Sequence, residues 1–248
     1  MGILNTTPDS FYDGGSYTTL EKALARAGEI LEQGAQIIDI GGESTRPGAL
    51  PLSIAEEIKR TAPVIKAIRK QYSRAAISID TYNYDTARAA LDEGASIIND
   101  VSGLRDLRLA RLAKTYNAKL VIMHTRGTPQ TMNDMCDYQD ILAEIYAFFE
   151  DKIQQASTCG LTRENLLLDP GLGFAKTKEQ NWFLLENLNY FDDLKIPFLI
   201  AASRKRFTDK TLELSLKAAA LAARANTAII RAHDVAETAK FLEGLCLR

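Results

Sequence analysis

The sequence predicts an α/β protein built as a single (β/α)₈ barrel. Eight short apolar, β-branched runs recur along the 248 residues, and a helical pattern follows each of them. Both the number of units and the chain length are typical of one such barrel. The runs are continuously apolar, as parallel strands covered on both faces require. A doubly wound sheet is the alternative, but the polar segment after the first run does not resemble its usual glycine-rich turn.

Each expected strand is a run rich in Ile, Val and Leu, and each expected helix repeats apolar residues every three to four positions. The expected strands cover residues 2–4, 36–40, 76–79, 96–98, 119–123, 165–168, 198–201 and 227–230. The expected helices cover residues 20–33, 55–71, 85–93, 107–116, 141–156, 179–191, 214–224 and 235–245. Capping-box spacing marks three helix starts, namely Thr18 with Glu21, Ser53 with Glu56, and Thr177 with Gln180.

Composition favours a small-molecule partner. A net charge of −2 gives no basic surface for nucleic acid and no polybasic segment for a membrane. No apolar run reaches the roughly 18 residues that span a bilayer. The three cysteines are far apart and form no CxxC pair, which favours a reducing, cytoplasmic location. Gly2 fits a loose N-myristoylation pattern, but the same residues are better explained as a buried first strand.

Polar residues follow nearly every expected strand, where the strand ends of a barrel converge on one pocket. A helix-capping role is the competing interpretation. It fails for Asp169, because Pro170 comes next and Thr177 caps the following helix. It stays open for Asp80 and is favoured for Asp234. The strand-end set comprises Asn5, residues 41–48, Asp80, Asn99, Asp100, His124, Asp169, residues 203–205, and residues 231–234.

The strand-end residues divide into two chemical groups. Carboxylates, an amide and a Lys can hydrogen-bond the edge of a flat heterocycle, and Asp80, Asn99, Asp169 and Lys205 supply them. Several cations and donors together suit a diphosphate, and Asn5, Arg46, Arg231, His233 and the Thr-rich first loop supply them. The sequence therefore predicts a pocket for an aromatic heterocycle that bears a diphosphate.

One aromatic residue lies among the glycines after the sixth expected strand. Phe174 on loop 171–176 could stack on a ring, although local packing is the commoner role of a loop aromatic. The glycines of this loop only weakly resemble a nucleotide-binding turn.

These segments, in this order, resemble the dihydropteroate synthase family of (β/α)₈ barrels. The resemblance runs nearly end to end, through "GILNTTPDSFYDGG", "IIDIGGESTRPGA", "SIDT", "IINDVSG", "MHTRGTPQTM", "LLLDPGLGFAK", "SRK" and "IIRAHDV". It implies a Mg²⁺-dependent transferase of folate biosynthesis and a sulfonamide target. Such an enzyme joins 6-hydroxymethyl-7,8-dihydropterin diphosphate to p-aminobenzoate, releasing pyrophosphate by a dissociative substitution.

The resemblance also assigns residues to each part of the reaction. The implied pterin-binding residues are Asp80, Asn99, Met123, Asp169 and Lys205. The implied diphosphate-binding residues are Asn5, Thr45, Arg46, Arg231 and His233, with Asn5 as the Mg²⁺ ligand. The implied p-aminobenzoate-binding residues are Phe174, Ser203 and Lys205, with Arg46 near the carboxylate. The implied catalytic residues are Asp13, Arg46 and Lys205, and the long first and second βα loops are expected to lie over the site.

The chain departs from the family pattern in a few places, and two other functions stay open. The segment between Lys205 and Arg231 is shorter than expected, and Ala175 and Ala201 replace usual glycines. The alternatives are a pterin-binding homologue without turnover and a methyltetrahydrofolate-binding methyltransferase, although the predicted diphosphate cations disfavour the latter. We expect one domain over residues 1–248 and a homodimer. Because the first expected strand begins at residue 2, the N-terminal side could be truncated, or adjoin another folate-pathway enzyme.

Overall fold

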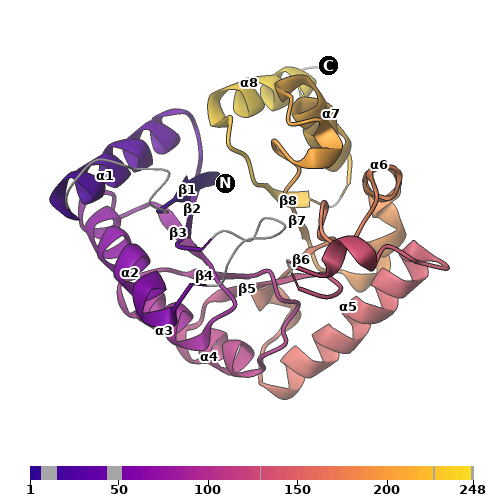
Figure 1. The fold of residues 1–248 in the computed structure, drawn as a ribbon, viewed down its shortest axis with the longest axis horizontal. Helices are drawn as coiled ribbons and strands as arrows, with labels where there is room; N and C mark the ends of the chain where they lie inside the picture. The colour runs from indigo at the N-terminus through magenta and orange to yellow at the C-terminus, as the bar shows by residue number, and fades with distance from the viewer. Residues whose placement is uncertain (7–15, 44–51, 129, 226, 247–248) are drawn as a thin grey trace.

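A computed structural model describes residues 1–6, 16–43, 52–128, 130–225 and 227–246. Eight parallel strands form one sheet in the order β1 to β8, each paired with the next. The sheet closes through a parallel bridge between Gly2 and Ala232, where the Ile3 amide donates to the Ala232 carbonyl at 3.2 Å. Figure 1 shows the helices arranged around the outside of the strands. The predicted (β/α)₈ barrel is confirmed.

The described strands match the apolar runs to within one residue at each end, except that β4 ends two residues later than predicted. Their bounds are β1 Gly2–Asn5, β2 Ile37–Gly41, β3 Ala76–Asp80, β4 Ile97–Asp100, β5 Lys119–Met123, β6 Leu166–Asp169, β7 Phe198–Ile200 and β8 Thr227–Ile230. The strands are short because each needs only to cross the barrel once. Asn5, Asp80 and Asp169, the polar residues after three of the runs, are the last residues of β1, β3 and β6.

Eight α-helices follow the strands in alternation. Their bounds are α1 Ser16–Glu32, α2 Ile54–Gln71, α3 Tyr84–Asp92, α4 Arg108–Tyr116, α5 Ile141–Thr158, α6 Lys178–Glu186, α7 Leu212–Ala222 and α8 Val235–Cys246. The shortened segment after Lys205 still holds a 3₁₀ turn, η5 Arg206–Thr208, before α7 and β8. It therefore completes the last two units of the barrel. Among the described residues, no helix is both long and apolar enough to cross a bilayer.

Two of the three predicted helix starts are confirmed. Ser53 caps α2 by accepting from the Glu56 amide, and Thr177 and Gln180 form a reciprocal capping box at α6. The start predicted at Thr18 is wrong, because α1 already begins at Ser16.

The single helix expected over residues 179–191 is also wrong. Helix α6 ends at Glu186, and a separate 3₁₀ helix, η4 Leu188–Leu194, continues the chain. The Asn187 side chain turns back to the Phe183 carbonyl at 2.8 Å, as Asn does at helix ends.

The barrel interior has an apolar lower layer and a polar upper layer. Side chains alternate between the interior and the helices along each strand, so residues two apart on a strand share a face. The polar layer lies two positions beyond the apolar one, at the carboxyl ends of the strands. The interior apolar cluster consists of Ile97, Val121, Leu167, Leu199 and Ala201, with Met1, Ile37 and Ile229 against it.

The larger apolar core lies between the strands and the helices. It contains the alternate strand residues, such as Ile38, Ile79 and Ile122, and the inner faces of the helices. This core fixes the strands, and the strands in turn fix the polar layer at the barrel mouth.

Candidate active site

Three neighbouring strands each contribute one polar side chain to the upper layer of the barrel. Asp39 of β2, Asp80 at the end of β3 and Asn99 of β4 each lie two residues after an interior position. Asp39 is fully buried and Asn99 is nearly so. The register pairs Asp80 with Asn99 across β3 and β4. The sheet thus brings the predicted Asp80 and Asn99 side by side.

Arg231, directly after β8, links two of these strands. Its Nε donates to Asp39 Oδ2 at 2.6 Å and one Nη donates to Asp80 Oδ2 at 2.8 Å. The two carboxylates raise the pKa of the Arg231 guanidinium despite its burial. Burial, opposed by the Arg231 cation, raises the pKa of Asp80 to about 7, and the Asp39 charge adds to the rise. One guanidinium therefore neutralises two buried carboxyl groups only in part.

Three buried oxygen atoms of this layer have no hydrogen-bond partner among the described residues. They are Asp39 Oδ1, Asp80 Oδ1 and Asn99 Oδ1. The other atoms of these groups are engaged, since Asn99 Nδ2 donates to Asp39 Oδ2 at 3.2 Å. Buried polar atoms normally have partners, because leaving one unpaired costs about 1 to 3 kcal/mol. These acceptors suit a ligand that presents several N–H donors on one flat edge.

The far side of the mouth carries a carboxylate, a lysine and an aromatic ring. Asp169, at the end of β6, accepts from the Gly171 amide at 2.7 Å. Burial raises the pKa of Asp169, and the Lys205 cation opposes this rise. Lys205 donates to the Leu172 carbonyl at 2.5 Å and lies 4.8 Å from the centre of the Phe174 ring. Burial lowers the pKa of Lys205 to about 8.

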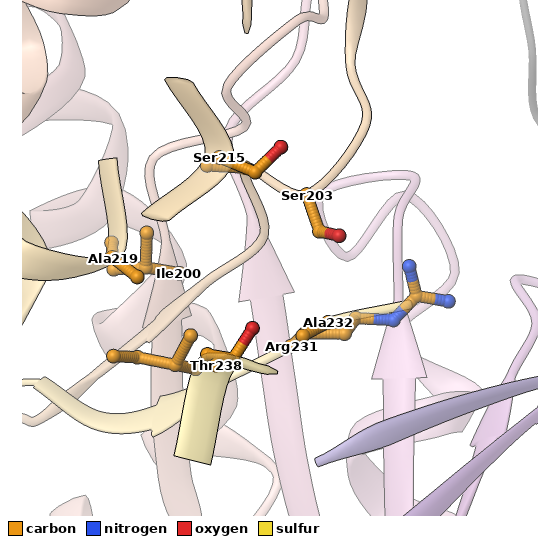
Figure 2. A pocket seen from close by; sticks show the side chains of 9 residues that line it. Ile200, Ser203, Ser215, Ala219, Arg231, Ala232 and Thr238 are labelled. Carbon is orange, nitrogen blue, oxygen red and sulfur yellow. The ribbon is translucent and has the colours of Figure 1, made fainter. Parts of the chain in front are cut away.

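The loops after β7 and β8 meet beside Arg231. The His233 amide donates to Ser203 Oγ at 3.0 Å, and His233 Nδ1 lies 3.3 Å from the same oxygen. Figure 2 shows Ser203 and Arg231 among the residues that line a small pocket, with Ser215 above them in this view. The predicted Ser203, Arg231 and His233 are therefore neighbours.

Asp234 directly precedes α8, at the position of the predicted cap, and its side chain also pairs with an arginine. Its two carboxylate oxygens accept from Arg204 Nε at 2.6 Å and from an Arg204 Nη at 2.9 Å. The Arg204 guanidinium holds the pKa of this carboxyl below its usual range. The pair joins the β7 loop to the β8 loop and so keeps Ser203 next to His233. Its geometry is bidentate, which is the stronger arrangement for Arg and carboxylate.

Two other strand-end residues point away from the mouth. Asp100 is buried and accepts from the Ser102 and Leu104 amides at 2.8 and 2.7 Å, so it holds its own loop. His124 packs edge-on against Phe148 of α5, with the ring centres 4.9 Å apart. Because Met123 takes the interior position, alternation turns His124 toward the helices.

The metal-binding prediction rests on the first strand. Asn5 ends β1 and pairs in register with Gly41, which pairs in turn with Asp80. A side chain on Gly41 would lie 3.6 Å from Asn5 Oδ1 and 3.6 Å from Asp80 Cβ, so glycine keeps this corner of the mouth open. The described residues contain no cluster of three His, Cys, Asp or Glu side chains that could hold a metal ion alone.

The structure describes most, but not all, of the predicted site residues. Asp13, Thr45 and Arg46, together with most of the two loops that carry them, lie outside the described residues. Asp39 is the residue that the sequence reasoning missed. The predicted strand-end residues are those that follow an apolar run, and Asp39 lies inside one. Because side chains alternate along a strand, Asp39 of "IIDIG" shares the interior face with Ile37.

Comparisons with known proteins agree with this geometry. Residues 1–241 match the family model described as "Pterin binding enzyme". The chain is 46% identical over 246 residues to a dihydropteroate synthase of Streptococcus pyogenes, covering 95% of this chain and 90% of the relative. Two solved structures share its fold closely.

The first is the dihydropteroate synthase of Clostridium difficile, solved in the presence of pteroic acid. It is 41% identical with a TM-score of 0.91, covering 98% of this chain and 93% of the other. The second, from Xanthomonas albilineans, is in complex with 7,8-dihydropteroate. It is 34% identical with a TM-score of 0.88, covering 99% of this chain and 91% of the other.

Proposed function

This chain belongs to the pterin-binding enzymes, in the dihydropteroate synthase family, and from that premise we propose how its barrel mouth works. The chain is a transferase of folate biosynthesis. Its reaction joins 6-hydroxymethyl-7,8-dihydropterin diphosphate to p-aminobenzoate. A carbon–oxygen bond breaks, pyrophosphate leaves with the electron pair, a carbon–nitrogen bond forms, and the aniline nitrogen releases a proton.

The pterin ring binds against the polar layer. The observation that carries this assignment is the pair of unpartnered, buried acceptors Asp80 Oδ1 and Asn99 Oδ1. A 2-amino-4-oxopteridine presents adjacent N–H groups that would satisfy them. Asp169 faces the same space as a third acceptor, while Lys205 donates to a ring carbonyl or ring nitrogen. Met123 lines the slot between them. The product complex of the Xanthomonas albilineans relative supports a pteridine ligand for this family.

The diphosphate lies toward β1 and β8, where Asn5, Arg231 and His233 project, and Thr45 and Arg46 of the second loop complete this subsite. Because the first step separates charge, the site must stabilise a leaving anion and a ring-stabilised cation. Positive groups near the diphosphate and carboxylates near the ring meet these two needs. We place Asp13 of the first loop near the carbon under attack.

Mg²⁺ would be carried mainly by the substrate. Mg²⁺ keeps several waters and is commonly bound through one or two protein oxygens plus substrate phosphates. Asn5 Oδ1, at the open corner beside Gly41, fits such a site as the single described protein ligand. When bound, the ion would neutralise charge on the departing diphosphate.

The p-aminobenzoate subsite lies between Phe174, Ser203 and Lys205. Phe174 offers a ring face, and Ser203 and Lys205 offer donors, which Arg46 would supplement at the carboxylate. Because an aniline is neutral at pH 7, its attack on a cation needs positioning rather than a strong base. Lys205 agrees with this, because burial lowers its pKa to about 8 and so makes its amine a weaker base than that of an ordinary lysine.

The test is pyrophosphate release from the dihydropterin diphosphate, with and without p-aminobenzoate. We expect release together with formation of 7,8-dihydropteroate. Pterin binding without any product would instead indicate a homologue without turnover. Methyl transfer from methyltetrahydrofolate would indicate the methyltransferase alternative.

Three further features belong to this proposal. We propose that residues 1–248 act as one domain, since a single sheet takes strands from both ends of the chain. A homodimer is supported by the exposed apolar side chains of Phe183 and Tyr190, on α6 and η4. The free thiols of Cys136 and Cys159 support a cytoplasmic location. Light scattering of the purified protein tests the dimer.

A further inference from the structure

Lys176, in the loop between β6 and α6, has no role in the reaction described above. It is nevertheless buried, with 9% of its surface exposed. Its Nζ contacts three acceptors, namely the Gly171 carbonyl at 3.1 Å, the Phe174 carbonyl at 3.0 Å and His124 Nδ1 at 3.0 Å. A lysine ammonium has three N–H groups, so all of its donors are used. Burying such a charge is costly, and Lys is rarely buried unless its ammonium group is paired.

The loop that Lys176 spans has an unusual backbone. Gly171 and Gly173 have positive φ values of 69° and 81°, and Ala175 has a φ of 48°. An alanine in this region carries a steric cost that glycine does not. A side chain on Gly171 would lie 1.9 Å from the His124 carbonyl oxygen. The loop is therefore pressed against the end of β5 in a conformation that other contacts must hold.

The same loop carries part of the predicted p-aminobenzoate subsite. Phe174 is on it, and the Leu172 carbonyl accepts from Lys205 at 2.5 Å. Asn181 of α6 fixes the centre of the loop by accepting from the Gly173 amide at 2.6 Å. Lys176 fixes the two ends of the segment that bears Phe174, because it holds the carbonyls of residues 171 and 174.

We propose that Lys176, supported by His124, is a positioning residue that holds the 171–175 segment so that Phe174 and Lys205 can receive p-aminobenzoate. The assignment of that substrate rests on the proposed function. The backbone of Asp169 is held separately, since the His124 amide donates to the Asp169 carbonyl at 2.8 Å, although the Asp169 carboxylate accepts from the Gly171 amide of this segment. Asp80 and Asn99, on β3 and β4, lie outside the segment, so this part of the pterin layer should keep its shape when the lysine is lost.

The charges around Lys176 are consistent with this role. Burial lowers the pKa of Lys176 to about 7, Lys205 and Arg126 lower it further, and Asp169 and Cys136 oppose them. Burial also lowers the pKa of His124 well below its usual value, so its ring is neutral. A neutral Lys176 amine still has two N–H groups for the two carbonyls, while its lone pair can accept from His124 Nδ1. Either protonation state therefore holds the loop.

The experiment compares Lys176→Met with Lys178→Met. Lys178 is two residues away, is half exposed and pairs with Asp209 on the surface, so it is a matched control. In Lys176→Met, we expect the KM for p-aminobenzoate to rise about tenfold or more, with the pterin Kd changed less than about threefold. Amide hydrogen exchange of residues 171–175 should speed up by about tenfold, while the strands stay protected. Lys178→Met should show neither change.

Unchanged exchange in the loop, or an equal loss of pterin and p-aminobenzoate binding, would overturn the proposal. Hydrogen exchange also separates this inference from the proposed function, because it is measured without substrates. If the wild-type protein released no pyrophosphate, the function would fail while the role of Lys176 in the loop remained testable. Should Lys176→Met not fold, His124→Leu removes one partner only. It should raise the same KM by about threefold, and no change in that variant counts against the proposal.

Discussion

Replacing Asp80 with Asn tests whether the Asp80 carboxylate binds the pterin ring. The substitution keeps the side-chain volume but exchanges an acceptor oxygen for an NH₂ donor in one of the two terminal positions. The remaining oxygen can still accept from Arg231, which now bonds Asp80 Oδ2 at 2.8 Å. The position of the unpartnered Asp80 Oδ1 would then face the pterin with a donor.

The magnitude follows from the kind of hydrogen bond that is lost. A hydrogen bond to a charged group contributes about 1.5 to 3 kcal/mol, which corresponds to roughly a 10- to 150-fold weaker Kd. The protein should stay folded, because Arg231 keeps its ion pair with Asp39 at 2.6 Å. This one carboxylate is enough to balance the charge of the guanidinium. The melting temperature should therefore change by no more than a few degrees.

The raised pKa of Asp80 adds a second, independent signature. In the ligand-free protein that pKa is about 7, so the carboxyl group gains a proton as the pH falls through 7. The carboxylate is the form that accepts from the pterin, so wild-type affinity should fall below pH 7 and level off above it. In Asp80→Asn this part of the pH dependence should be absent.

Calorimetry with a hydroxymethyl pterin that lacks the diphosphate measures both effects. Asp85→Asn, at a half-exposed side chain on α3, is the matched control and should bind normally. A Kd for Asp80→Asn within about threefold of wild type would refute the pterin assignment. A pH profile that is the same in both proteins would refute the role of the carboxylate.

Three further predictions concern the neighbouring groups. Phe174→Leu should raise the KM for p-aminobenzoate by about 3- to 10-fold with little change in the pterin Kd, since a stacking contact contributes about 0.5 to 1.5 kcal/mol. A sulfonamide should inhibit competitively against p-aminobenzoate in steady-state assays, and inhibition that excess p-aminobenzoate does not relieve would argue for another site. The pKa of Lys176 is about 7 when folded and 10.5 in its ordinary state, so the unfolded chain binds more protons between these values. The free energy of unfolding of the wild type should therefore rise from pH 7 to pH 10 relative to Lys176→Met, by at most about 4 kcal/mol in urea titrations.

The strands were predictable because their signal is local. A continuous run such as "KLVIM" is β-branched and apolar enough to identify β5 to the residue. Helix ends were harder, since the break at Asn187 depends on a side-chain bond back to Phe183 and on the packing of η4. Propensity alone does not resolve such a choice between one helix and two.

The candidate site was predictable as a set of residue types but not as a set of partners. The sequence places Arg231 with the anion-binding residues and Asp80 with the ring-binding ones. The structure instead joins them, through a contact 151 residues apart in the chain. Asp39 lies 192 residues from the same guanidinium. Pairings over such separations follow from closure of the barrel, which no local pattern encodes.

This pairing bears on how the two halves of the mouth work together. Arg231 contacts Asp80, which is proposed to bind the ring, and lies beside residues proposed for the diphosphate. It is charged at all relevant pH values. A pterin that donates to the unpartnered Asp80 Oδ1 would share with Arg231 the carboxylate that the guanidinium holds through Oδ2. Weakening that bond would leave more of the guanidinium for the diphosphate oxygens. The ring and the diphosphate would then bind cooperatively through one side chain fixed at the end of β8, whereas the p-aminobenzoate subsite depends on the separate loop that Lys176 holds.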